Sequence, residues 1–340
     1  MVIADRRAHN VYQITGNGSS FLKDRRHDRP KMSTGAVESG SANLRWGVAK
    51  RLEFIEFRLV WYGRLNRREL MDEFSLSPQQ ASSDIALYEK IAPSNLEYDK
   101  NEKAYMRTKN FNQKFLRPAS DRLLLQAAGI RSGWLAREDT WFSELPPIEV
   151  SGLPRWPVDT KNLISILDAI RSRQQVEVNY KSLSGSPAGP RLIAPHSLIQ
   201  GAGRFYVRAW SEEHNDFRDY NLARIDSVGH ESPSPIDSGL DYEWHHLIDL
   251  IIAPNNNLPE QKQAAIADEY GMDDGRLVVT MRVSLCFYLM TENNLDIPLG
   301  VLKPEKQQLV LLNQEEVFEA RSATRRLSKE ALARVQLRNA

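Results

Sequence analysis

The most constraining stretch of the chain is a pair of capped helices that follow each other closely. Asn66 is placed to cap the first helix, and Glu69 stands three positions later, where it completes a capping box. Ser77 is placed to cap the second helix, Pro78 suits its first position, and Gln80 completes a second capping box. Only a few residues separate the two helices, so the sequence predicts a tight turn between them.

The second of these helices has one apolar and one polar face. Ala81, Ile85 and Tyr88 recur at helical spacing and predict a buried stripe, with a phosphate contact as the alternative role of Tyr88. The opposite face carries short polar or small side chains and one lysine: Gln79, Ser82, Ser83, Ala86 and Lys90. Short amides and hydroxyls fit a DNA major groove, where base edges offer donors and acceptors. The alternative is a structural three-helix bundle whose polar face is only solvated.

The surrounding sequence supplies the rest of a winged helix-turn-helix. An apolar helical period precedes the capped pair: Leu44, Val48, Leu52, Ile55 and Leu59. Strand-like residues follow the capped pair, on both sides of a polar turn at 99–103: Leu96, Tyr98, Ala104 and Met106. A long helix, two helices with a tight turn, and a hairpin together predict a winged helix-turn-helix over residues 44–112.

Two groups of side chains are candidates for contacts with DNA. We expect base contacts from the start of the second capped helix: Ser77, Gln79, Gln80, Ser82 and Ser83. We expect phosphate contacts from basic residues at the start of the preceding helix (Arg64, Arg67 and Arg68), from Lys90, and from the hairpin tip (Lys100 and Lys103). Phosphate contacts position a protein on DNA, whereas base contacts give it sequence specificity.

The composition excludes several classes of protein. The chain has 340 residues, enough for two or three domains, and its 41% hydrophobic and 26% charged residues are ordinary for a soluble globular protein. Because the net charge is only +1, any site that binds anions must be a local cluster of positive charge. The single cysteine, Cys286, allows neither a disulfide nor a thiolate metal cluster. This cysteine usage suits a reducing cytoplasm. No apolar run approaches the roughly 20 residues of a membrane span, so we expect no membrane partner.

The sequence also lacks the common motifs of catalysis. It contains no HExxH, no GxxxxGK[ST] and no Cys/His spacing typical of a metal site. The adjacent His245 and His246 do not share one helical face, so they do not suggest a metal site on a helix. We therefore expect no enzyme, no catalytic residues, no metal and no cofactor. A nuclease or nucleotide hydrolase is the less favoured alternative.

Two stretches on either side of the winged helix are less regular. Residues 1–43 have little periodicity and predict a disordered arm, with Met32 as an alternative natural start. The other interpretation of this segment is a tail that contacts DNA phosphates through its basic residues: Arg25, Arg26, Arg29 and Lys31. Residues 115–150 look helical and belong to a helical linker at 113–156, which ends in "SGLPRWP".

The second half of the chain predicts a small barrel and an extension. A helix at 160–173 carries four apolar residues on one predicted face: Leu163, Ile164, Leu167 and Ile170. Four short strand candidates follow, with breaks at "SGSPAG" and "GAG": "QQVEVNYK", "RLIAPHSLI", "RFYVRAW" and "FRDYNLARI". Their close spacing predicts a small β-barrel within residues 157–232. Residues 233–340 mix helical and strand patterns and predict an α+β extension, which makes the whole chain an α+β multidomain protein.

Arginines and aromatic residues alternate along these strands. Alternation places Arg208 beside Tyr206 on one strand face, and the next strand contributes Arg218. Arginine forks bind phosphate or carboxylate, and neighbouring aromatic rings stack on bases, so the strands offer a candidate site for a phosphorylated or nucleotide ligand. The alternative is a solvated sheet face on which Arg218 pairs with Asp216, or Arg208 with Glu212.

These strands carry a resemblance to a known family. The stretch "VEVNYKSLSG…PRLIAPHSLI…GRFYVRAWSEEHNDFRDYNLARIDSV" resembles a WYL domain, an Sm-like or SH3-like small barrel of bacterial transcription regulators. The triplet that names the family falls at Phe205-Tyr206-Val207, where only the tyrosine is kept. With "FSLSPQQASSDIALY" and "NLEYDKNEKAYM", the chain is similar from residue 44 to 325 to the winged-helix WYL repressors of the BREX and CBASS anti-phage systems.

The resemblance implies a specific function. It implies a homodimer that binds an inverted-repeat operator in double-stranded DNA and represses its own defence locus, in the bacterial cytoplasm at the nucleoid. An activator of the same architecture is the alternative. It further implies a nucleotide or single-stranded nucleic acid as effector, and a dimerisation role for residues 233–340. By motif position, the ligand-binding residues are Tyr180, Ser182, Arg191, His196, Tyr206, Arg208, Arg218 and Arg224.

Overall fold

The structure is a computed structural model that describes residues 44–116, 119–152, 157–183 and 189–339. Contacts divide the chain into two compact units, Met1–Gly152 and Leu153–Ala340. The arm expected at 1–43, most of the "SGLPRWP" linker, and the break at 184–188 lie outside the described residues.

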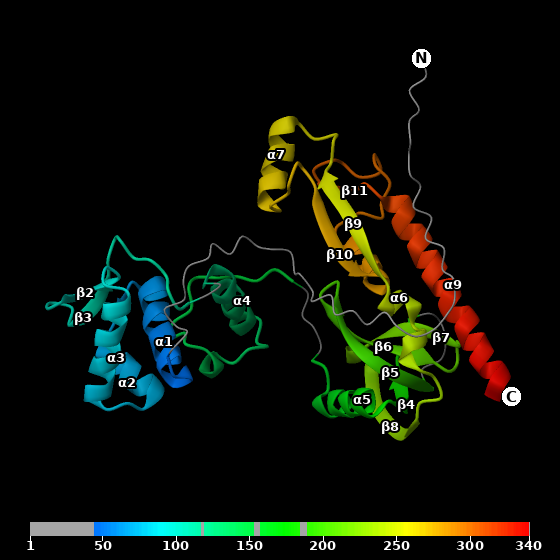
Figure 1. The fold of residues 1–340 in the computed structure, drawn as a ribbon, viewed down its shortest axis with the longest axis horizontal. Helices are drawn as coiled ribbons and strands as arrows, with labels where there is room; N and C mark the ends of the chain where they lie inside the picture. Colours follow the sequence, from blue (N-terminus) through cyan, green and yellow to red (C-terminus); the bar gives the residue numbers. More distant parts are fainter. Residues whose placement is uncertain (1–43, 117–118, 153–156, 184–188, 340) are drawn as a thin grey trace, which may run out of the picture. The chain divides into compact units, whose positions relative to one another are not determined.

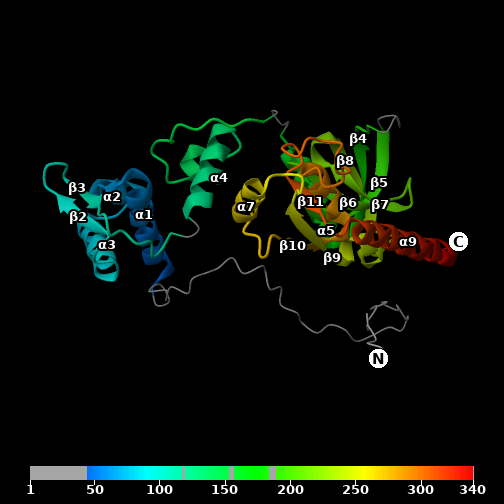
Figure 2. The same ribbon diagram turned by 90° about the horizontal axis from the view of Figure 1, so that it is seen from above.

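The first unit contains the predicted winged helix-turn-helix. Its body consists of three helices, α1 (Trp46–Tyr62), α2 (Arg67–Phe74) and α3 (Pro78–Ile91). Its sheet has the order β1-β3-β2 and consists of β1 (Arg64–Leu65), β2 (Leu96–Asp99) and β3 (Ala104–Arg107). The β2–β3 hairpin projects from one end of the helices (Figures 1 and 2). β1 was not expected, because two residues are too few to show the alternation of a strand.

The helix caps agree with the sequence in all but one detail. The Asn66 side chain accepts a hydrogen bond from a backbone amide at the start of α2. The Glu69 side chain accepts one from Asn66 N at 2.7 Å, which completes the capping box. Ser77 Oγ accepts from Gln80 N at 3.2 Å and so caps α3 as expected. The second capping box is wrong, since Gln80 Nε2 donates instead to Asp84 Oδ1 at 3.1 Å.

One apolar cluster holds the three helices together. Its fully buried members include the residues of the predicted stripes: Leu52, Ile55, Leu59, Leu65, Leu70, Ala81, Ile85 and Tyr88. Tyr88 has no exposed surface, which confirms its core position and excludes the alternative of a phosphate contact.

The segment after the wing is only partly helical. It forms α4 (Ala119–Arg131) and a short 3-10 turn, η1 (Arg137–Asp139). The helical prediction is wrong for residues 132–136 and 140–150, and in the second of these stretches Trp141 and Phe142 pack against α1 instead. Pro146 and Pro147 in this stretch lack the amide hydrogens that a continuing helix needs.

The second unit begins with a helix on a five-stranded antiparallel sheet. Helix α5 (Thr160–Ser172) precedes β4 (Gln174–Tyr180), β5 (Gly189–Gly201), β6 (Arg204–Ser211), β7 (Asp216–Asn221) and β8 (Ile225–Pro233). The sheet order is β7-β6-β5-β4-β8, and only the 3-10 turn η2 (Leu222–Arg224) joins its two edge strands along the chain. The sheet therefore curls strongly, but the described residues form no β7–β8 ladder that would close the predicted barrel. β8 is an additional strand that the sequence did not predict.

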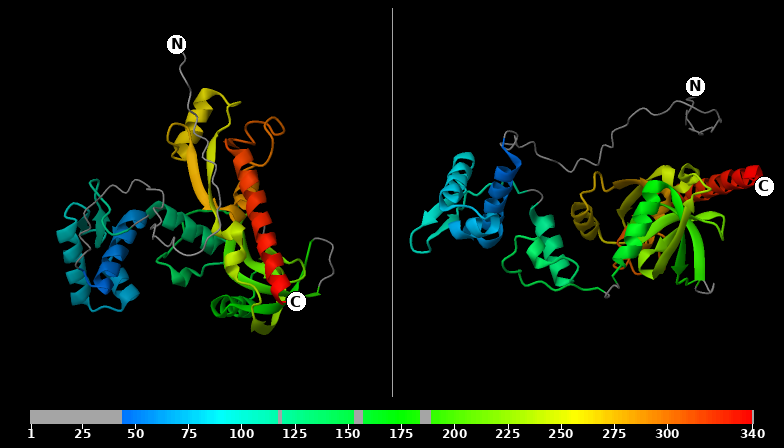
Figure 3. Two further views of the ribbon diagram at one scale, coloured as in Figure 1. Left: turned by 45° about the vertical axis from the view of Figure 1, so that its right-hand side comes forward. Right: turned by 90° about the horizontal axis from the view of Figure 1, so that it is seen from below.

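Helix α5 lies along one side of this sheet (Figure 3), and only two of the four residues predicted to be buried, Leu163 and Ile170, pack against the core. Ile166 and Ala169 are fully buried, whereas Ile164 and Leu167 remain 52% and 37% exposed. The helix has apolar residues on more than one side, so periodicity alone selected a face that overlaps the buried one only in part.

The rest of the second unit is a smaller α+β layer, as predicted. A sheet of order β10-β9-β11 consists of β9 (Leu247–Pro254), β10 (Leu277–Arg282) and β11 (Leu309–Leu311). The remaining elements are η3 (Ser238–Leu240), α6 (Tyr242–His245), α7 (Glu260–Glu269), η4 (Val283–Leu285), α8 (Cys286–Glu292) and α9 (Gln314–Asn339). Helix α9 starts in the core of the small sheet with Val317 and reaches the large sheet with Leu332 (Figure 1).

Candidate nucleic-acid interface

Helix α3 presents the predicted polar face to solvent. Its exposed residues include Gln79, Gln80, Ser83, Ala86 and Lys90. Ser82 is half-buried and accepts a hydrogen bond from Arg67 Nη1 at 3.1 Å. The Ser83 hydroxyl donates to Gln79 O at 3.0 Å. Within the described residues, the Gln79 amide makes no side-chain hydrogen bond, so it is the member of this set most available to a base edge.

A buried carboxylate fixes α3 on α1. Asp84 is almost fully buried, and its Oδ2 lies 2.6 Å from Arg51 Nε while its Oδ1 lies 3.1 Å from Arg51 Nη2. The same Oδ1 accepts from the exposed Gln80 amide. This fork pairing sets the position of the helix and of Gln80 together. Sequence reasoning missed both Arg51 and Asp84, although a charge inside the Ala81–Tyr88 stripe is a usable signal.

A second buried carboxylate joins α1 and α3 to the segment that leaves the wing. Glu56 has no exposed surface and accepts from the backbone amides of Lys114, Phe115 and Leu116 at 2.6–2.7 Å. The Tyr88 hydroxyl also donates to Glu56 Oε1, at 3.1 Å. Burial and the Glu56 charge raise the pKa of Tyr88 well above its usual range, so its hydroxyl stays protonated as a donor.

The N-terminus of α2 connects the other predicted DNA-contacting elements. Its Arg67 reaches α3 through Ser82, and Asn66 Nδ2 donates to Lys103 O in the hairpin turn at 3.2 Å. The start of α2, the polar face of α3 and the wing therefore form one continuous surface. Arg64 is a correction to the prediction, because it lies in β1 and not at the start of α2.

The basic residues of this surface are mostly solvent-exposed. Arg68 lies 3.6 Å from Asp72, and Arg64 lies 3.6 Å from Glu102, in pairs whose side chains are all more than half exposed. Exposed pairs of this kind contribute only about 0–1 kcal/mol, so phosphates compete with them easily. Lys100 and Lys90 make no ion pair with any described residue.

The predicted ligand-binding residues of the large sheet fall on two opposite faces. Tyr180 packs on the apolar core beneath α5, Arg191 pairs with the core residue Val178, and Arg218 pairs with the core residue Ala209. Directly paired residues point to the same face, so these three share the inner face of the curled sheet. Ser182 follows β4, and Arg224 lies half-buried in η2.

Buried polar atoms gather on this inner face. Arg191 Nε is buried without a hydrogen-bond partner among the described residues, and the buried hydroxyls of Ser211 and Tyr220 lie next to each other. Arg191 Nη1 pairs with Glu213, whereas the exposed Arg218 makes no ion pair within the described chain. Burial raises the pKa of Tyr220, against the lowering influence of Ser211, Arg191 and Arg218. Ser211 and Tyr220 were not predicted, because their packing is visible only once the strands are in register.

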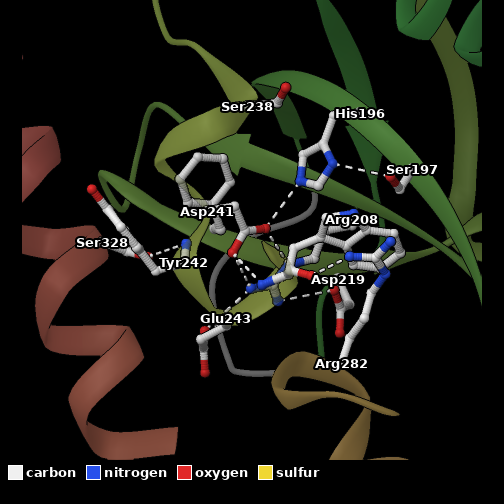
Figure 4. A network of polar contacts seen from close by, with 12 residues as sticks. His196, Ser197, Arg208, Asp219, Ser238, Asp241, Tyr242, Glu243, Arg282 and Ser328 are labelled. Atoms are coloured by element: carbon white, nitrogen blue, oxygen red, sulfur yellow. Dashed lines mark hydrogen bonds and ion pairs between the residues drawn. The ribbon is translucent and has the colours of Figure 1, made fainter. Parts of the chain in front are cut away.

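Arg208 lies on the outer face, where it is enclosed by carboxylates (Figure 4). Its Nε and Nη2 lie 2.7 and 2.9 Å from the two oxygens of Asp241, and Nη1 lies 3.2 Å from Asp219 Oδ1. Glu243 Oε2 is 3.2 Å from Nη2. Burial alone would raise the pKa of Asp241, but hydrogen bonds from Arg208 and His196 lower it overall.

This network joins the large sheet to the extension. Asp241 and Glu243 belong to α6 and its cap, and Tyr288 of α8 donates to Asp219 Oδ2 at 2.8 Å. Arg208 is therefore paired, as the alternative interpretation expected, but with other carboxylates than Glu212. Arg218 does not pair with Asp216. His196 Nε2 lies 3.0 Å from Asp241 Oδ2 and takes part in the same network.

Aromatic packing adds to this junction. The Tyr206 ring lies 5.0 Å from the Tyr288 ring, between their centroids. A Cβ on Gly201 would lie 2.5 Å from the Tyr288 ring, so only glycine permits this close approach. Tyr206, His196 and Arg208 thus serve the contact between the sheet and the extension in this structure.

Comparison with known proteins identifies the family of this chain. Three family models match successive parts of the chain: the BrxR transcriptional regulator winged helix-turn-helix domain over 47–129, the WYL domain over 161–229, and the BrxR C-terminal dimerization domain over 247–317. The DNA-binding transcriptional repressor CapW of Escherichia coli (strain KTE188) is 33% identical over 293 residues, which cover 83% of this chain and 94% of that protein. The chain belongs to the CapW family of WYL-domain repressors.

Further CapW proteins show the same coverage. CapW of Pseudomonas aeruginosa is 33% identical over 291 residues, 83% of this chain and 94% of that protein. CapW of Stenotrophomonas maltophilia is 31% identical over 280 residues, 82% of this chain and 94% of that protein. A solved structure, proteasome accessory factor B/C of Arthrobacter aurescens, covers 89% of this chain and 51% of its own at 16% identity, but its TM-score of 0.19 is too low to bear on the fold.

The family membership confirms the WYL resemblance and the expectation that the chain is not an enzyme, since the CapW relatives are transcriptional repressors. No group of histidine, cysteine and acidic side chains suited to a metal occurs in the described part of the chain. None of the helices within the described ranges is both long and apolar enough to cross a membrane.

Proposed function

We propose that the chain is a DNA-binding transcriptional repressor that acts as a homodimer on an inverted-repeat operator of its own phage-defence locus. The observation that carries this proposal is the continuous surface formed by α2, α3 and the wing, with a free amide at Gln79. The repressor names of the CapW relatives and the match to a dimerization domain support it. Such a repressor works in the bacterial cytoplasm, at the nucleoid.

The residues of this surface divide into three roles. Gln79, Gln80 and Ser83 face the bases, because they are exposed on the N-terminal half of α3. Ser77 and Ser82 hold the helix start, through the cap and through Arg67. Phosphate contacts come from the basic side chains Arg67, Arg68, Lys90, Lys100 and Lys103. A two-fold dimer would present two α3 helices about 34 Å apart, or a multiple of this, along the duplex.

The first prediction separates base contacts from phosphate contacts. We expect Gln79→Ala to weaken binding to the operator about tenfold while leaving random DNA unaffected, because a paired amide contributes roughly 1–3 kcal/mol of base discrimination. We expect Lys100→Ala to weaken binding to both DNAs and to reduce the salt slope by about one. Fluorescence anisotropy at several salt concentrations measures both effects, on an operator located by footprinting DNA upstream of the gene.

Lys161→Ala is the matched control, since Lys161 is an exposed lysine on α5 of the other unit. Equal losses on operator and random DNA for Gln79→Ala would contradict its role in base reading. A reporter gene behind the operator distinguishes repression from the alternative of activation: expression rises on deletion of a repressor and falls on deletion of an activator.

The proposal includes relief of repression by a nucleotide or single-stranded nucleic acid at the WYL sheet. Arg218 is exposed without an ion pair in the described residues, and the buried Nε of Arg191 lacks a hydrogen-bond partner there. An unpaired buried donor of this kind favours a polar ligand. Tyr180, Ser182 and Arg224 flank the same strands. A ligand shifts the repressor only if it binds one dimer geometry more tightly than the other.

The second prediction tests this effector. We expect Arg218→Ala to weaken binding of a fluorescent ATP analogue or a labelled oligothymidine about tenfold or more, because a charged hydrogen bond contributes roughly 1.5–3 kcal/mol. Arg171→Ala is the control, since Arg171 is an exposed arginine that pairs with Asp168 on α5. Unchanged titration of both probes by the Arg218 variant would place the effector elsewhere. Arg208 is not tested in this way, because its partners bury it.

A further inference from the structure

The small sheet of the second unit has two different faces. β9 is its central strand, with Ile251 paired to Val278 of β10 and Ala253 paired to Val310 of β11. Side chains alternate along each strand, so the neighbours of these residues point to the opposite face. That opposite face packs into the apolar core with Leu250, Ile252, Leu277, Val279, Leu309 and Leu311. The face that carries Ile251 and Val278 is called the outer face of the small sheet.

The outer face is apolar although it is exposed. Leu247, Val278 and Leu312 are 54%, 53% and 49% exposed. Leu312 N donates to Ile251 O at 2.7 Å, so Val278, Ile251 and Leu312 form a row across all three strands. The solvent face of an antiparallel sheet usually alternates to polar residues, and a contiguous exposed apolar patch marks an interaction surface.

Charged residues lie on either side of this row, and Arg282 on the Asp249 side is occupied with Trp244, to whose backbone oxygen it donates at 2.5 Å. Asp249 stands two residues before Ile251 on β9, and Arg276 stands two residues before Val278, immediately before β10 begins. Because the strands are antiparallel, the two charges lie at opposite ends of the face. Asp249 accepts from Thr280 at 2.5 Å, but within the described residues neither Asp249 nor Arg276 makes an ion pair.

We propose that the outer face of the small sheet is the surface on which two copies of this chain meet. This inference rests on the proposed homodimer and names its contact. The occupant is a second copy because the match to a C-terminal dimerization domain starts at Leu247, the first residue of β9, and spans this sheet. The two sheets pack face to face about a two-fold axis along the row Val278–Ile251–Leu312.

The charges agree with this symmetry. A two-fold rotation about the row exchanges its two sides, so the end of one sheet that carries Asp249 meets the end of the other that carries Arg276. Each dimer then contains two equivalent carboxylate–guanidinium contacts at the rim of an apolar centre. Interfaces commonly have such a dry centre and polar rim.

The experiment measures the dimer dissociation constant of the full chain by sedimentation equilibrium, without DNA. We expect Val278→Asp to raise this constant at least roughly tenfold, because it buries a charge in the apolar centre. We expect Asp249→Arg and Arg276→Asp each to weaken the dimer, and the double variant to recover most of the loss. Ile164→Asp is the matched control, since Ile164 is an equally exposed aliphatic residue on α5. Circular dichroism verifies that every variant is folded.

Three outcomes would overturn the inference. They are a monomeric wild-type chain at micromolar concentration, a Val278→Asp variant that dimerises like the wild type, and a double charge variant as weak as its single parents. The readout without DNA separates this inference from the proposed function. A monomeric Val278→Asp variant that still binds a half-site, but loses affinity for the full inverted repeat, would support both. A chain that dimerises through this face yet binds no DNA would contradict the proposed function alone.

Discussion

Replacing Arg208 with methionine is expected to lower the free energy of unfolding of the second unit by about 3–5 kcal/mol, because the change leaves buried carboxylates without their cation. Arg208 is 4% exposed and contacts Asp219, Asp241 and Glu243. For a unit of this size, a loss of this magnitude lowers the melting temperature by roughly 10 °C. Differential scanning calorimetry of the full chain measures the shift.

Arg325→Ala is the matched control for this variant. Arg325 lies 3.9 Å from Glu243, one of the same carboxylates, but its side chain is 57% exposed. Its loss is expected to cost less than about 1 kcal/mol. A melting temperature of the Arg208 variant close to that of this control would contradict the role of Arg208 as the cation of the buried network.

The same network predicts a dependence on pH. The pKa of Asp241 is lower in the folded protein than in the unfolded chain. The stability that Asp241 contributes is therefore complete above its unfolded pKa of about 3.9 and is lost as the pH falls below that value. Asp241→Asn should flatten the stability profile of the second unit below about pH 4. A profile unchanged in that range would show that Asp241 is not the group responsible.

Replacing Glu56 with alanine is expected to have a comparably large effect on the first unit. Its carboxylate accepts three backbone amides and the Tyr88 hydroxyl, and all lose their acceptor together. An unsatisfied buried donor costs roughly 1–3 kcal/mol, so we expect a loss of about 3–5 kcal/mol after partial relaxation. Operator affinity should fall as well, because Tyr88 anchors α3 to α1.

Glu89→Ala is the control for Glu56, since Glu89 is an exposed carboxylate on α3 itself. Urea denaturation followed by circular dichroism measures stability, and anisotropy measures binding to the operator. If the Glu56 variant matched the Glu89 variant in both measurements, the buried carboxylate would not be holding α3 in place.

Local sequence signals were sufficient for the winged helix. Caps at Asn66 and Ser77, and the stripe of Ala81, Ile85 and Tyr88, each act within a few residues of the chain. Such local preferences agree with the final packing here, so the helices and the hairpin were predicted close to their observed bounds. The two-residue strand β1 escaped this reasoning, since it exists only by pairing with β3.

The candidate sites depended more on long-range packing. The partners of Arg208 in α6 lie 33 and 35 positions away in the sequence, and no local pattern selects Asp241 and Glu243 over Glu212. The buried face of α5 was likewise undecided, because its apolar residues allow more than one rotation on the sheet. The resemblance to WYL regulators assigned the expected ligand-binding set to these strands, but it did not separate the two faces of the sheet.

Helix α9 has a mechanical consequence for the second unit. It is 26 residues long, or about 39 Å at the usual rise per residue, and Val317 near its start and Leu332 in its second half lie in different hydrophobic clusters. A helix held at two such points transmits movement from one to the other. A small tilt imposed where Leu332 touches the large sheet displaces the distant Val317 end, so events at the two sheets are mechanically linked without any change in the helix itself.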